Sequence, residues 1–74
     1  MARVLHVLKG GHAETALAVI RPQAAAGDQV GVALLGGVAA PALPSGVTVH
    51  RVPEDTSYER LLELIFEADS VVAW

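Results

Sequence analysis

Four consecutive residues near the start of the chain have the composition of an anion-binding turn. Lys9, Gly10, Gly11 and His12 follow a short apolar run and precede a helical pattern. In open α/β sheets, ligands collect where a strand ends and the next helix begins, and the free N–H groups of that helix favour anions. Lys9 or His12 could add positive charge there. Because two glycines also suit a plain tight turn, both interpretations of this stretch stay open.

The other histidines and a pair of carboxylates are the remaining side chains with chemical potential. His6 lies inside an apolar run, so we expect a packed, hydrogen-bonded imidazole rather than a metal ligand. His50 is expected on a strand face. Glu54 and Asp55 are adjacent, and their expected role is to favour the positive end of the helix that follows. We therefore expect no metal, no cofactor and no catalytic residue in this chain.

The 74 residues contain no cysteine. Disulfides, thiolate zinc sites, persulfide carriage and thiol nucleophiles are therefore excluded within this chain, and a cytoplasmic location is expected. The net charge is −3 and the five basic residues are scattered, which argues against direct binding of nucleic acid. No apolar run is long enough to span a bilayer, and the first residues do not resemble a signal peptide.

The proportion of apolar residues is high for so short a chain. Hydrophobic residues make up 53% of the sequence and charged residues 18%. A chain of this length buries only about 60% of the surface that its unfolded form exposes. We therefore expect a single domain, residues 1–74, that hides part of its apolar surface in a subunit interface.

Four segments have the composition of strands. Residues 4–8 are almost continuously apolar, which is typical of a strand covered on both faces of a parallel sheet, and we predict that this is the central strand. Residues 29–35 and 47–52 are the second and third strands. The third alternates more, which indicates a less covered position. Residues 70–74 form the last strand.

Two helical patterns alternate with these strands. The first begins at Ala13, and Pro22 either kinks it or ends it near Arg21, with one further turn after a restart. We favour one kinked helix that ends at Gly27-Asp28, with Gly27 as the left-handed cap. In the second, Thr56 and Glu59 fit a capping box. A wide apolar stripe follows the cap, and part of it is expected to face a partner; its members are Tyr58, Leu61, Leu62, Ile65, Phe66 and Ala68.

The connection over residues 38–46 is predicted to be a loop, because Pro41 and Pro44 would each break a helix. Strands and helices otherwise alternate, which predicts an α/β fold with a mostly parallel sheet and right-handed crossovers. So thin a loop covers little, and one face of the sheet should be poorly shielded near the second and third strands.

Two stretches resemble proteins of the DsrH/TusB family. Residues 58–64, Tyr-Glu-Arg-Leu-Leu-Glu-Leu, followed by residues 67–74, Glu-Ala-Asp-Ser-Val-Val-Ala-Trp, are similar to the end of these proteins. The shared features are an aromatic-led helix, an acidic residue and Asp before a short strand, and a closing Ala-Trp. Residues 4–9, Val-Leu-His-Val-Leu-Lys, resemble the family's opening strand, and residues 27–35 fit its second strand.

The resemblance implies a DsrE-like fold, for which we expect a four-stranded sheet of order 2-1-3-4. It also implies a role in sulfur relay, either in 2-thiolation of the tRNA wobble uridine or in sulfur oxidation. Family members assemble with DsrE- and DsrF-type (TusD- and TusC-type) partners, and the DsrE-type partner holds the principal sulfur-carrying cysteine. Some members also have a cysteine in the first helix, where this chain has none near Ile20, and typical members are longer around residues 38–46.

We therefore expect a non-catalytic subunit of a sulfur-relay complex without activity of its own. Its interface is expected at Tyr58, Leu62, Phe66 and Trp74. The alternative is a self-associating module of the same fold that binds a small anion or another ligand at residues 9–12 and has no role in sulfur transfer.

Overall fold

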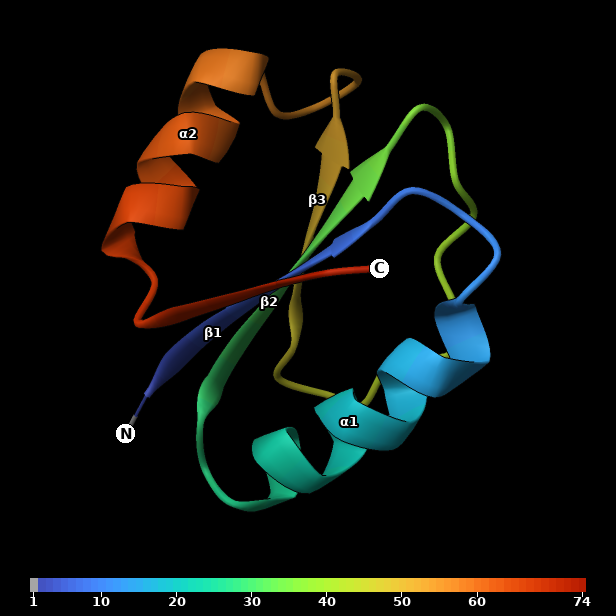
Figure 1. Ribbon diagram of the computed structural model, residues 1–74, viewed down its shortest axis with the longest axis vertical. Helices are drawn as coiled ribbons and strands as arrows, with labels where there is room; N and C mark the ends of the chain where they lie inside the picture. Colours follow the sequence, from blue (N-terminus) through green and yellow to red (C-terminus); the bar gives the residue numbers. More distant parts are fainter. Residues whose placement is uncertain (1) are drawn as a thin grey trace.

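The strands form one parallel sheet, and the two helices lie on its opposite faces (Figure 1). This arrangement comes from a computed structural model that describes residues 2–74. Neither helix in this range is long and apolar enough to cross a membrane. The elements in chain order are β1 Arg3–Leu8, α1 Ala13–Ala25, β2 Gln29–Leu35, β3 Thr48–Val52, α2 Tyr58–Glu67 and β4 Ser70–Ala73.

The order of the strands is β3-β2-β1-β4, so the predicted order 2-1-3-4 is wrong. The predicted order would place β2 and β3 on either side of β1, and their connection would have to pass over that strand. Residues 36–47 form this connection without a helix. Since parallel neighbours already need a crossover of about a dozen residues, so short a connection places β3 directly beside β2, with Thr48 opposite Gly31.

β1 is an interior strand, as its apolar composition predicts. It pairs with β2 on one side and β4 on the other. Leu8 packs into a cluster with Ala16 and Ile20 of α1. Leu5 and Val7 point to the opposite face, into a cluster that includes Leu61 of α2. Both faces of β1 are therefore buried, while β3 and β4 are the edges of the sheet.

The first helix continues through Pro22, as predicted, and ends in a glycine cap. Gly27 has φ 89°, and its N–H donates to the carbonyl of Ala24 at 3.1 Å. The N–H of Asp28 donates to the carbonyl of Gln23 at 3.2 Å. This pair of bonds satisfies two carbonyls of the last turn, and a left-handed residue at this position favours glycine.

The connection between β2 and β3 covers the sheet better than expected on the α1 side. Val38, Leu43 and Val47 pack against the cluster beneath α1. The part of the sheet that remains poorly shielded lies instead on the α2 face, over β2 and β3, where a groove is found. The sequence thus predicts the exposed region near these two strands but not the face on which it lies.

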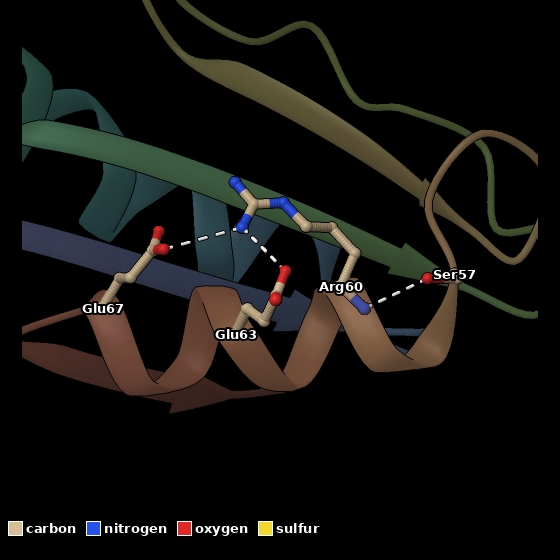
Figure 2. A network of polar contacts seen from close by, with 4 residues as sticks. All are labelled: Ser57, Arg60, Glu63 and Glu67. Carbon is tan, nitrogen blue, oxygen red and sulfur yellow. Dashed lines mark hydrogen bonds and ion pairs between the residues drawn. The ribbon is translucent and has the colours of Figure 1, made fainter.

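The second helix begins one residue later than the predicted capping box requires. Ser57 is the N-cap, and its Oγ accepts a hydrogen bond from the backbone N–H of Arg60 at 3.1 Å (Figure 2). Thr56 is buried, and its hydroxyl donates to Oδ1 of Asp55 at 3.0 Å. The predicted capping box of Thr56 and Glu59 is therefore wrong, because the Thr56 hydroxyl forms its hydrogen bond in the preceding turn.

Candidate functional site

The turn formed by Lys9, Gly10, Gly11 and His12 lies where the sequence predicts, between the end of β1 and the start of α1. All four residues are exposed. Gly10 and Gly11 have φ of 120° and 84°, a conformation that favours glycine. The imidazole of His12, at the N-cap, makes no capping hydrogen bond. The acidic residue Glu14 occupies the first turn of α1 and opposes an anion there.

The position of this turn in the sheet is the one that suits ligands best. Strand order reverses between β1 and β4, since the chain leaves β1 toward β2 and returns to β4 on the other side. Crevices at such switch points, outside the carboxyl ends of the strands, are common ligand sites in open α/β sheets. Trp74 lies at the same edge, where its backbone N–H donates to the carbonyl of Val7 at 2.9 Å. The anion site at the turn stays a prediction.

His6 is fully buried and forms hydrogen bonds through both ring nitrogens, as expected of a packed imidazole. Nε1 of Trp74 lies 3.0 Å from Nδ1, and Oε1 of Gln23 lies 2.7 Å from Nε2. An indole nitrogen only donates, so Nδ1 accepts and Nε2 carries the proton that Gln23 accepts. The rings of His6 and Trp74 are nearly parallel, at 16°, with centroids 6.1 Å apart. These bonds join β1, α1 and the residue after β4.

The sequence does not reveal this network. Gln23 lies one helical turn after the buried Ile20, so a polar residue close to the core-facing side of α1 is the signal that could have indicated a partner for His6. Trp74, predicted as an interface residue, is only half-buried and directs its indole N–H inward to His6. It is therefore less available to a partner than the exposed residues of α2.

The three histidines are not brought together. His6 packs beneath α1 against Gln23, and His12 is in the exposed turn. His50 lies on the other face of the sheet, in a groove that Leu64 of α2 also lines. Within residues 2–74 there is no group of three or more histidine or carboxylate side chains placed to hold a metal ion.

Three residues on one side of α2 leave large apolar side chains in solvent. Tyr58, Leu62 and Phe66 are 60%, 55% and 86% exposed, and their spacing of four residues places them in one row, here called the α2 stripe. Leu61 points to the sheet and is buried. Val71 of β4, which is 42% exposed, pairs with Leu5 and so points to the α2 face of the sheet.

The other flank of α2 is charged. Arg60 Nη1 lies 3.1 Å from Glu63 Oε1 and 3.6 Å from Glu67 Oε2 (Figure 2). The hydrogen bond to Glu63, followed by the charge of Glu67, raises the pKa of the Arg60 guanidinium above its usual value. The helix is thus two-sided outside the sheet: Glu67 of the ionic flank lines a groove over β1, β2 and β3, and the apolar α2 stripe runs along the other flank.

Asp55, one of the two adjacent carboxylates after β3, has a structural role. Asp55 Oδ1 accepts the backbone N–H of Arg51 at 2.8 Å and the hydroxyl of Thr56. The backbone hydrogen bond from Arg51 is the main cause that lowers the pKa of Asp55 below 3.8. Asp55 therefore fixes the turn that leads from β3 into α2.

A groove of about 560 Å³ lies between α2 and the amino-terminal halves of β1, β2 and β3. We call it the Gly31 groove. Its floor includes Leu5, Gly31 and His50, and its sides include Arg3, Leu64 and Glu67. The sequence gives little indication of it, because only the isolated Gly31 in an otherwise apolar strand marks a place where side-chain volume is missing.

Comparisons with known proteins leave the site to be interpreted on its own geometry. No protein-family model, no curated protein and no solved structure matches this chain.

Proposed function

We propose that this chain is a non-catalytic docking subunit of a sulfur-relay assembly, with a DsrE-like fold and a role similar to that of DsrH/TusB proteins. The resemblance of residues 58–64 and 67–74 to that family suggests the pathway. The absence of a thiol assigns persulfide carriage to another subunit, since only a thiolate could hold it. The assembly would act in the cytoplasm, in wobble uridine thiolation or in sulfur oxidation.

The α2 stripe is the observation that carries this proposal. Fully burying a side chain of the size of Leu or Phe contributes about 1.5–3 kcal/mol relative to leaving it in water. In the isolated chain Leu62 and Phe66 lack most of this stabilisation, because they are 55% and 86% exposed. Tyr and Phe are also enriched in protein interfaces. A DsrE-type partner seated on the stripe would bury these residues and bring its own cysteine to the assembly.

The β4 edge is a second part of the proposed docking surface, because Val71 of β4 is 42% exposed and points to the face of the sheet that carries α2. β4 pairs with β1 on one side only, and residues 70–73, Ser-Val-Val-Ala, include no charge or proline that would discourage a further strand. A partner could therefore contact the stripe with side chains and the edge with its backbone.

Co-purification of the chain with DsrE- and DsrF-type proteins from the same genome tests the proposal. We expect a stable complex, detected by size exclusion with light scattering, that is lost in Leu62→Asp and Phe66→Asp. Val19→Asp is the matched control, because Val19 is a 37% exposed apolar residue of α1, on the opposite face of the sheet. Failure of every DsrE-type protein to bind, or equal loss of binding in the control, contradicts the proposal.

The second candidate is a self-associating module that binds a small anion at residues 9–12. The observation in its favour is the exposed glycine turn at the carboxyl end of β1, next to the switch point of the sheet. A stable oligomer of the chain alone, together with phosphate- or sulfite-dependent amide shifts at Gly10 and Gly11, would favour this function over the docking subunit.

A further inference from the structure

Gly31 occupies a position that does not require glycine. Its φ lies outside the left-handed region, and a Cβ built on it would lie 3.5 Å from Leu5 Cδ1 and 4.0 Å from His50 Nε2, ordinary contact distances. Glycine in a strand lacks a side chain to pack and weakens the strand. Neither backbone conformation nor crowding explains the residue. Its effect is to leave the floor of the Gly31 groove open.

Two nitrogen-bearing side chains around this open floor have unused hydrogen-bonding capacity. His50 is half-buried, and its ring makes no hydrogen bond within residues 2–74. Arg3 donates from Nε to Oε1 of Gln29 at 3.1 Å. Within residues 2–74 there are two ion pairs, and both belong to Arg60. No carboxylate oxygen therefore lies within 4.0 Å of the terminal nitrogens of Arg3.

The carboxylates around the groove are, by contrast, already engaged. Asp28 Oδ1 accepts the N–H of Ala2 at 3.4 Å, and Asp69 Oδ2 accepts the N–H of Arg3 at 2.8 Å. Glu67 is 3.6 Å from Arg60 Nη1, which offsets part of its charge. Among the ionisable side chains of the groove, Arg3 and His50 are those with nitrogens that make no hydrogen bond or ion pair within residues 2–74, and their chemistry favours an anionic oxygen.

We infer that the Gly31 groove binds a small organic carboxylate. The apolar body of the ligand lies on Gly31 between Leu5 and Leu64, and its carboxylate accepts hydrogen bonds from Arg3 and His50. The volume of about 560 Å³ is within the range of known small-molecule sites, which combine an apolar lining with a few polar groups. The site lies at the amino ends of the strands, whereas the turn at residues 9–12 follows the carboxyl end of β1.

Titration of ¹⁵N-labelled protein with benzoate, phenylacetate and isovalerate tests the inference. We expect amide shifts at Gly31, Thr48 and His50 with at least one of the three acids. The uncharged amide of the same acid should bind about tenfold more weakly, since it lacks the charge-assisted bonds. Shifts at Gly10 and Gly11 instead of the groove would overturn the inference, as would silence of the groove with all three acids.

Substitutions distinguish binding in the groove from binding elsewhere on the protein. Gly31→Leu fills the floor and should abolish the shifts at Thr48 and His50, while Gly31→Ala, whose Cβ meets only ordinary contacts, preserves the fold and weakens binding. Arg3→Gln should weaken binding about tenfold. Arg21→Gln, an exposed arginine on α1, is the matched control and should change nothing. Unaltered affinity in Gly31→Ala and Arg3→Gln would contradict the site.

Discussion

At the scale of single residues, two polar side chains hold apolar elements in place. His6 is fully buried yet satisfied at both ring nitrogens, by Trp74 and Gln23. A buried acceptor that loses its donor costs the full desolvation of that group, which is more than the bond itself contributes. Asp55 acts at the surface, where it organises the turn after β3.

Trp74→Phe is expected to lower the free energy of unfolding by about 1–3 kcal/mol, because Nδ1 of His6 is left buried without a donor. Urea unfolding measures this. His6→Leu removes the acceptor as well, so the double variant should lose less than the sum of the two single losses, by about 0.5 kcal/mol or more. Strict additivity would mean that the Trp74–His6 bond does not contribute.

Asp55 is expected to make the free energy of unfolding depend on pH in the acid range. Its pKa is lowered in the folded state, so its contribution is present above the usual value of 3.8 and is lost as pH falls through the folded value. Asp55→Asn should therefore be less stable than the wild type near neutral pH, and the difference should shrink in acid below about pH 4. Urea midpoints at several pH values measure it, and a difference that does not vary with pH would contradict this role.

At the scale of elements, the hydrophobic pattern predicts where each strand and helix lies but not the details that side-chain competition decides. The bounds of β2 are those predicted, and the other strands differ by one residue at an end. The cap of α2 was misplaced because Thr56 and Ser57 can both cap a helix. Only the burial of Thr56 beside Asp55 decides between them.

Ser57→Ala is expected to destabilise the protein by about 1 kcal/mol, since it removes the acceptor for the N–H of Arg60. Thermal or urea unfolding measures the loss. Ser57→Asp keeps an acceptor at the N-cap and should retain most of the stability. If the aspartate variant were as unstable as the alanine variant, a cause other than capping would have to explain the loss.

At the scale of the whole molecule, composition predicts that apolar surface remains exposed, and the α2 stripe is where it lies. The predicted strand order is wrong, and apolar composition could not correct it, because composition reports how well a strand is covered rather than which strand is its neighbour. The length of the connection over residues 36–47 could have indicated the order, since a connection this short suits adjacent parallel strands. The Gly31 groove was missed because it depends on three strands and a helix meeting.

Neighbouring leucines of α2 give a sharp contrast in stability. Leu61→Ala should cost about 2–5 kcal/mol, because Leu61 is 8% exposed and packs in the core. Leu62→Gln should change the free energy of unfolding by no more than about 0.5 kcal/mol, as expected of a surface site, while reducing association with any partner of the α2 stripe. Urea unfolding and light scattering measure the two effects. A large loss of stability in Leu62→Gln would place that residue in the core rather than in an interface.

The bond between His6 and Trp74 spans 68 positions of the chain, and the β1–β4 pairing has a similar separation. Contacts so distant in sequence close the largest loops and are the slowest to form during folding. With one neighbour and exposed side chains, β4 should also be the strand that opens most readily, and its amides should exchange hydrogen faster than those of β1 and β2. A protein seated on the α2 stripe and this edge would slow that exchange, so assembly and completion of the sheet would be linked.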